Sequence, residues 1–293
     1  MFSLCPLCLC GENSSLEARL APLAKAHKGQ VAIAVKHLGT GESYYLDADR
    51  VMPTASLIKV AVLIEAYRQA DEGKVKMTGP VTLRDADRVP GSGVLTYHFS
   101  DGVSLPLRDA VRLMIAFSDN TATNLVLDKV GIAAVNKRMA EWGLPETRIN
   151  AKVFRGSTTS VDPARTRRYG LGSTTAREMV KLFEELQTGE RLRPPLKQVI
   201  LTHLKHNEDK DKFKRLLPEG TVVVHKDGSV SNARTDAGLI YTPSGVIAVC
   251  VMTDNNKDRR WASDNAGNVL CARVAKEVYD YFNPAPAAAA AGK

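Results

Sequence analysis

The chain has 293 residues and a mass of 31.8 kDa, which is long for one compact domain and short for two independent ones. Hydrophobic residues make up 44% of it and charged residues 25%, which excludes wholesale disorder, and no apolar run reaches the ~20 residues of a membrane span. The formal net charge of +8 is spread along the chain without an aromatic–basic repeat, so we expect no nucleic-acid partner.

Both ends of the chain lack the pattern of a folded element. An apolar segment near the start carries three cysteines, Cys5, Cys8 and Cys10. A lone C-x-x-C is weak evidence for zinc, and the segment lacks the basic start of a signal peptide, so we predict a disordered or processed N-terminus over residues 1–13. Residues 283–293, rich in Ala and Pro, are expected to form a disordered tail.

The folded part begins with a helix and a β-hairpin. Ser14 and Ser15 can cap a helix in which leucines recur at helical spacing, at Leu16, Leu20 and Leu23. Residues 30–37 are predicted to form a strand, a glycine-containing turn follows, and residues 42–46 are the expected partner strand.

A long helical block comes next and extends to about residue 205. Its apolar stripes predict helices over residues 56–76, 107–117, 121–129, 132–142 and 175–186. Strands and a last helix are then expected over residues 221–224, 237–241, 246–252 and 265–282. Cys250 and Cys271 fall in apolar stretches of this part and are predicted to be small core residues.

Neither end of the chain holds enough strands for an independently stable sheet. We therefore predict an α/β fold with an all-α lobe, in which one antiparallel sheet with flanking helices is assembled from both chain ends and a helical lobe is inserted. The expected domain covers residues 14–282, with a sheet lobe of residues 14–52 and 206–282 and a helical lobe of residues 53–205. A pocket is expected between the lobes.

Ser56 and Lys59 open the first helix of the block, in Thr54-Ala-Ser56-Leu-Ile-Lys59. Three residues apart on a helix, they share a face beside the free N–H groups and the positive dipole of the helix start. A serine becomes nucleophilic when a base takes its proton, and a lysine can be that base when burial or a neighbouring cation keeps it neutral. Alone, S-x-x-K is weak, because a capping serine is common.

Ser118-Asp119-Asn120 separates two predicted helices. Such a break can be an ordinary helix cap. The functional interpretation gives Ser118 a proton-shuttling hydroxyl and Asn120 an amide that holds a substrate carbonyl.

His225-Lys226-Asp227-Gly228-Ser229 follows the apolar strand 221–224. It can be a strand running into a turn. In the functional interpretation, Lys226 lowers the pKa of a nearby amine and attracts an anionic substrate. Gly228 then lets a substrate backbone lie against the strand edge.

In this order, the three motifs resemble the S-x-x-K, S-D-N and K-T-G signature of class A β-lactamases and penicillin-binding proteins. The residues around them are also similar, in Pro53-Thr-Ala-Ser56, Ser118-Asp-Asn-Thr-Ala122 and His225-Lys-x-Gly228. The resemblance covers about residues 14–282, so the chain is identified as a member of this family of penicillin-recognising serine enzymes.

The resemblance implies a role for each motif residue. Ser56 would attack an acyl carbonyl of a β-lactam or related amide, and Lys59 would be the base that activates it. Ser118 would pass a proton to the leaving nitrogen, and Asn120 would hold the substrate amide. Lys226 would sustain this proton network and help to bind a substrate carboxylate.

The remaining expectations concern binding. The backbone N–H groups of Ser56 and Ser229 would form an oxyanion hole, with Gly228 beside it. Arg234 is either a bidentate carboxylate clamp or a solvated surface arginine. No metal or organic cofactor is expected. The resemblance further implies a monomer that is exported or periplasmic, acts on β-lactams or peptidoglycan-like substrates and confers antibiotic resistance by β-lactam breakdown.

Two departures from the family pattern matter. Asp227 stands where the family usually has Thr or Ser, and its carboxylate would repel an anionic substrate. The family's Glu-x-x-Leu-Asn loop, whose glutamate activates water, is missing, and Val153 falls near the glutamate position. Glu146 and Asp162 are close in sequence but out of register, unless one of them folds back into the pocket.

Three functions remain open from the sequence. The first is a hydrolase of β-lactams, and the second is a D,D-peptidase or esterase on the same scaffold with slow deacylation. The third is a non-catalytic binding module on a decayed enzyme fold. A metal site at His203 and His206 is not expected, since both are predicted to be surface residues.

Overall fold

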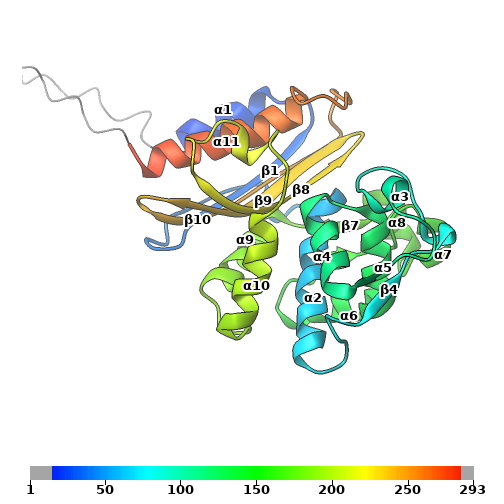
Figure 1. The fold of residues 1–293 in the computed structure, drawn as a ribbon. Coiled ribbons are helices and arrows are strands. Elements are labelled where there is room, and N and C mark those ends of the chain that lie inside the picture. The colour runs from blue at the N-terminus through cyan, green and yellow to red at the C-terminus, as the bar shows by residue number, and fades with distance from the viewer. Residues whose placement is uncertain (1–14, 285–293) are drawn as a thin grey trace, which may run out of the picture.

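The centre of the computed structural model, which describes residues 15–284, is a five-stranded antiparallel sheet (Figure 1). Its strand order is β2-β1-β10-β9-β8, formed by β1 (Gln30–His37), β2 (Ser43–Leu46), β8 (Val222–Val230), β9 (Ala233–Thr242) and β10 (Gly245–Asp254). Strands from the two ends of the chain meet where β1 pairs with β10. The predicted sheet built from both chain ends is confirmed.

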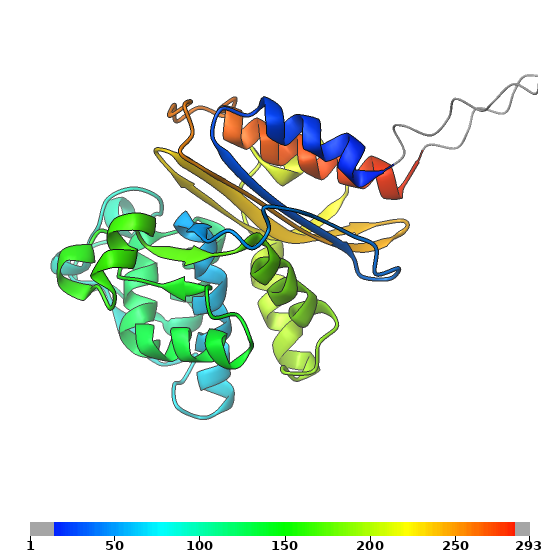
Figure 2. The ribbon, with the colours of Figure 1, turned by 180° about the vertical axis from the view of Figure 1, so that it is seen from behind.

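The sheet separates two hydrophobic cores because side chains alternate along its strands. Ile247, Val249 and Val251 of β10 pack under α1 (Leu16–Ala26) and α11 (Ala266–Phe282), which lie side by side over one face (Figures 1 and 2). Cys250 and Met252 face the other way, toward α9 (Ala176–Gln187). Cys250 and Cys271 are both buried, as predicted.

The other core continues into a group of helices around α2 (Lys59–Asp71), which is buried on nearly every side. The 3₁₀ helix η1 (Ala55–Ile58) leads directly into α2. The remaining helices are α3 (Leu95–His98), α4 (Leu107–Ala116), α5 (Asn120–Val130), α6 (Ile132–Glu141), α7 (Gly156–Thr159), α8 (Pro163–Tyr169) and α10 (Pro194–Lys205), of which α4, α5, α6 and α10 contact α2.

Short elements complete the chain. Two small sheets are formed by β3 (Met52–Pro53), β6 (Arg148–Ile149) and β7 (Gly172–Thr174), and by β4 (Pro80–Thr82) and β5 (Ser104–Pro106). The remaining 3₁₀ helices are η2 (Asp85–Asp87) and η3 (Phe213–Arg215). Within residues 15–284 no helix has the length and apolar character needed to traverse a lipid bilayer.

Several element bounds differ from the sequence-based expectation, among them the helix predicted over residues 56–76, which ends at Asp71. The strand predicted over residues 221–224 continues as β8 to Val230, because residues 226–230 pair with β9 instead of turning. His203 is buried rather than on the surface, and its Nε2 lies 2.6 Å from the Tyr67 hydroxyl. Burial lowers the pKa of His203 to about 4. His206 is exposed, as expected.

The division into a sheet lobe and a helical lobe at residue 205 stays a proposal, and α9 and α10 contact the sheet as well as the other helices. The predictions for the cysteine-rich N-terminus and Ser14, and for the tail from residue 285, concern residues outside the described range.

Candidate active site

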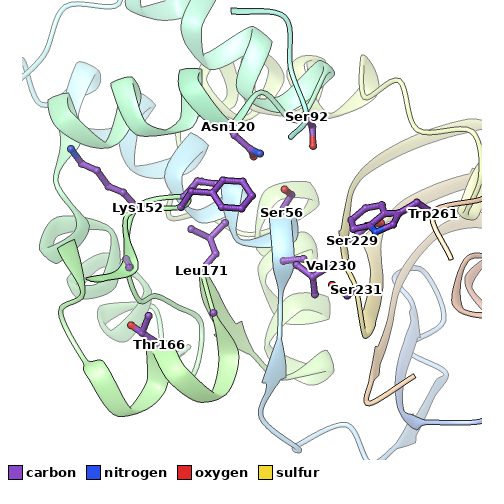
Figure 3. Close-up of a pocket in the computed structure, with 16 residues that line it drawn as sticks. Ser56, Ser92, Asn120, Lys152, Thr166, Leu171, Ser229, Val230, Ser231 and Trp261 are labelled. Atoms are coloured by element: carbon purple, nitrogen blue, oxygen red, sulfur yellow. The ribbon is translucent and has the colours of Figure 1, made fainter. Parts of the chain in front are cut away.

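A cavity of about 490 Å³ lies where the helices meet the edge strand β8 (Figure 3). Ser56 stands in it, between Asn120 and Ser92 on one side and Ser229 and Trp261 on the other. Apolar groups form most of the remaining wall, at Ala55, Ala151, Val153, Phe154, Leu171 and Val230. The three sequence motifs thus converge on one pocket.

Ser56 and Lys59 face the same way because they lie in and at the end of the 3₁₀ helix η1. Residues three apart eclipse one another in a 3₁₀ helix, so the lysine follows directly under the serine. The preceding residue, Ala55, has φ +47°, a left-handed conformation that a residue with a Cβ rarely adopts. Ser118 and Phe154, which also border the cleft, have φ +52° and +53°, so backbone strain gathers around this site.

Lys59 is fully buried and has no acidic partner within ion-pair distance among the described residues. Its Nζ lies 2.6 Å from the Ser118 carbonyl oxygen, 3.2 Å from Ser118 Oγ and 3.0 Å from Asn120 Oδ1. Burial, followed by the positive charge of Lys226, holds the pKa of Lys59 well below its ordinary value. The uncharged amine that a base requires is therefore favoured at this position.

The Ser118-Asp119-Asn120 segment is held by Asp119, which is completely buried. Its carboxylate caps α5 by accepting from Ala122 N at 2.7 Å, and it accepts from Val94 N and Leu95 N at 2.7 and 2.9 Å. These bonds fix the loop that brings Ser92 to the cavity. Asn120 donates from Nδ2 to the Pro90 carbonyl at 3.0 Å, which leaves its second amide hydrogen available to a ligand.

Gly228 brings β8 against the start of η1. A Cβ at this position would lie 2.4 Å from the Thr54 carbonyl oxygen and 2.9 Å from the Ser56 nitrogen. Only a glycine allows this approach, which sets the backbone nitrogens of Ser56 and Ser229 on the same cavity. Thr235 on β9 supports the contact by donating its hydroxyl to the Thr54 carbonyl at 3.0 Å.

Lys226 and Asp227 form part of a charged cluster on β8. Lys226 Nζ donates to Asp227 Oδ1 at 2.6 Å, and Asp227 Oδ2 accepts from Lys212 Nζ at 3.2 Å. Burial would raise the pKa of Asp227, but the two lysine ammonium groups hold it well below its usual range. Lys212 also donates to Asp209 at 2.8 Å, and Asn207 donates to Asp227 at 3.2 Å. Asp227, the departure from the family pattern noted in the sequence, is thus ionised and bound to both Lys226 and Lys212.

Arg234 is buried, and its guanidinium points to backbone carbonyls. It donates to the carbonyls of Val230, Ala233 and Arg260, the last two at 2.9 and 2.8 Å. The ring of Trp261 covers the guanidinium at 5.0 Å. Arg234 is therefore not a solvated surface residue, and its role as a carboxylate clamp stays a prediction that this bonding pattern does not favour.

No Asp or Glu lines the cavity around Ser56 among residues 15–284. Val153 stands in its wall, fixed by paired bonds between its backbone and the Asn124 amide at 2.8 and 3.0 Å. Glu146 is bound to Arg165 at 2.7 Å, and Asp162 caps α8. Neither carboxylate folds back into the pocket.

Sequence reasoning missed four residues that shape the site, namely Ser92, Lys212, Phe154 and Trp261. Phe154 and Trp261 are 66% and 72% exposed although they are large and apolar, which marks the rim of a binding cleft. None of the four lies in a recognisable motif. The only signal for Phe154 and Trp261 is their exposure, which the sequence alone does not reveal.

Comparison with known proteins finds the same family along the whole domain. Residues 15–282 match the profile described as the beta-lactamase enzyme family. A β-lactamase of Bacteroides uniformis is 27% identical over 287 residues, 92% of each chain, and one of Streptomyces cellulosae is 26% identical over 80% of this chain and 75% of its own.

Solved structures agree. The β-lactamase of Sphaerobacter thermophilus superposes with a TM-score of 0.80 at 29% identity, over 92% of this chain and 98% of that one. A mutant of PBP-A in which one leucine is replaced by glutamate, solved as an acyl-enzyme with penicillin G, has a TM-score of 0.79 at 26% identity over 91% and 95%.

Proposed function

The chain belongs to the beta-lactamase enzyme family and is a β-lactamase-like serine acyl-enzyme hydrolase, and we propose that it is acylated at Ser56 and releases the acyl group slowly. The observation that carries this proposal is the apolar wall beside Ser56. Val153, which falls near the family's glutamate position in the sequence, lines the cavity, and no described Asp or Glu does. The enzyme would then behave more like a penicillin-binding protein than a fast β-lactamase.

In the proposed acylation, Lys59 takes the proton of Ser56 and the serine oxygen attacks the carbonyl carbon. The negative charge on the carbonyl oxygen is stabilised by the backbone N–H groups of Ser56 and Ser229, each worth about 3 kcal/mol in hydrolases of this kind. The Ser118 hydroxyl gives its proton to the leaving atom and takes one from Lys59 Nζ, which lies 3.2 Å from Ser118 Oγ. Asn120 donates its free amide hydrogen to the acyl side of the substrate.

The second half of the cycle lacks a base. General-base activation of water typically contributes about 10²–10⁴ in rate, so its absence leaves the ester on Ser56 long-lived. A strained β-lactam still acylates such a site, whereas the substrate that turns over would be an ester.

The test is intact-protein mass spectrometry beside a nitrocefin assay. We expect one penicillin adduct per chain that persists after free penicillin is removed, with little steady nitrocefin hydrolysis, and no adduct in Ser56→Ala. Fast nitrocefin turnover without an adduct would contradict slow release. Inertness toward both a fluorescent penicillin and a p-nitrophenyl ester would instead support a non-catalytic binding module.

Export from the cytoplasm and a monomeric state are further parts of this proposal, taken from the family. Cell fractionation of the native host and analytical ultracentrifugation would test them.

A further inference from the structure

A second cavity of about 400 Å³ continues the cleft beyond Ser118 and Ser229. It shares Ser92, Ser229 and Trp261 with the cavity around Ser56, so it lies where the leaving group of a bound acyl donor would extend. Its walls carry four carboxylates, Glu208, Asp209, Asp211 and Asp227.

The cations at this end are already engaged. Lys226 is fully buried and donates to the carboxylate and the carbonyl of Asp227 at 2.6 and 3.0 Å. Lys212 is 2% exposed and is shared by Asp209 and Asp227. The guanidinium of Arg234 is bonded to three backbone carbonyls. A carboxylate entering here would have to displace Asp227 from Lys226.

Two of the acids form no ion pair with a described Lys or Arg. Glu208 is exposed and Asp211 half-buried, and neither lies within ion-pair distance of a Lys or Arg among residues 15–284, unlike Asp209 and Asp227. Four carboxylates therefore face the three cations Lys212, Lys226 and Arg234 around this cavity, an excess of one negative charge. Glu208 and Asp211 lie on the solvent side, where an incoming group meets them first. An excess of negative charge at the mouth of a cleft attracts ligands of positive charge.

We propose that Asp227, together with Glu208 and Asp211, determines which acyl donors this enzyme prefers. Donors with a positively charged leaving group are preferred most, donors with an uncharged leaving group come second, and donors whose leaving group carries a carboxylate come last. The inference rests on the proposed acylation of Ser56. In that step the Ser56 oxygen bonds to the acyl carbon, the bond to the leaving oxygen breaks, and that oxygen takes the proton given up by Ser56. Penicillins, which carry a carboxylate, are then slow acylating agents helped by ring strain.

The experiment uses three phenylacetylglycyl phenyl esters that differ only in the meta substituent of the phenol: aminomethyl, carboxamide or carboxylate. Each rate is divided by the uncatalysed rate in the same buffer, which corrects for leaving-group acidity. We expect kcat/KM to fall in that order, by about tenfold or more from the first to the last at low ionic strength, and the span to shrink in added salt. A carboxylate ester that is the best of the three would overturn the inference.

Two sets of variants assign the effect. Asp227→Asn frees Lys226, so the ratio of carboxylate to carboxamide ester should rise by about tenfold. Glu208→Gln with Asp211→Asn changes only cavity-rim acids and should lower the preference for the aminomethyl ester by about threefold. The matched control, Glu190→Gln with Glu219→Gln, removes two exposed acids that line neither cavity. If the kcat/KM ratios between the esters change no more in the cleft variants than in the control, the selectivity is not due to Asp227, Glu208 and Asp211.

The Ser56→Ala variant keeps the two proposals apart. Wild-type acylation that depends on Ser56 but favours the carboxylate ester refutes the selectivity and leaves the proposed function standing. No Ser56-dependent acylation by any of the three esters or by penicillin refutes both.

Discussion

Lys59 shows how a single side chain can be both costly and necessary. It is buried without an acidic partner, so the folded protein favours its uncharged form, which is the form that can accept the Ser56 proton. Lys59 Nζ lies within hydrogen-bond distance of three oxygens of Ser118 and Asn120, and a hydrophobic residue in its place would leave these oxygens without this donor.

The pH dependence of acylation should report this amine. Because the pKa of Lys59 is depressed, more of the amine is uncharged at neutral pH than in an ordinary lysine. The acylation rate should fall about tenfold per pH unit below that pKa as the amine is protonated. Lys226→Met removes the cation that helps to depress this pKa, so the acid limb should move to higher pH. The position of the acid limb is measured from penicillin-labelling rates across pH. Lys36→Met, which removes a lysine on β1, is the control and should leave the limb where it is. A limb that stays in place would show that Lys226 does not tune Lys59.

Val153 is the residue whose replacement should restore the missing step. Its backbone is fixed by the Asn124 amide, so a longer side chain at this position should enter the cavity toward Ser56. Val153→Glu should raise steady nitrocefin turnover by about 10²–10⁴ by supplying a base for water. Val153→Gln has the same shape without the basicity and should not. Equal gains in both variants would mean that the shape of the side chain at position 153, and not its ability to accept a proton, limits release of the acyl group.

At the scale of elements, the site depends on the contact between the edge strand β8 and η1. Gly228→Ala would place a Cβ against the backbone of Thr54 and Ser56, so the two elements must separate. We expect a loss of about 1–3 kcal/mol in the free energy of unfolding and a fall of about 10²-fold or more in penicillin labelling, because the oxyanion donors move apart.

Gly39→Ala is the control for this change, since it adds the same methyl group near only the His37 ring, away from the cleft. Thermal unfolding and labelling rates should both stay close to wild type in it. If Gly228→Ala also kept its full labelling rate, the backbone of β8 would not form part of the acylation site.

Local patterns predicted some elements well and others poorly, for physical reasons. The strand Gln30–His37 was predicted to the residue because its short apolar run, which is rich in β-branched residues, is bounded by polar residues and a turn. The extension of β8 through Lys226 and Asp227 was not, since charged residues in a strand look like a turn until their partners are known. Those partners include Lys212, in a loop without any pattern, which compensates Asp227. Motif residues were found because their order is distinctive, but the walls of the pocket depend on distant packing.

For the whole molecule, the sheet is the wall that both cores share. Cys250 on β10 lies in the core toward α9, and Cys271 on α11 lies in the core on the opposite face. Burial raises the pKa of both thiols well above the ordinary value, so neither is a reactive thiolate in the folded protein. Each thiol therefore reports the opening of one core.

Because strands from both chain ends pair along β1 and β10, we expect neither core to open without the other. In a variant with Cys5, Cys8 and Cys10 replaced by serine, Cys250 and Cys271 should react with a thiol reagent at the same rate, at least about 10³-fold more slowly than in denaturant. Mass spectrometry of partly labelled protein measures this, since cooperative opening yields doubly modified chains with few singly modified ones. An accumulation of chains modified at Cys271 alone would show that α11 detaches while the helical side stays folded, and that the two faces of the sheet unfold separately.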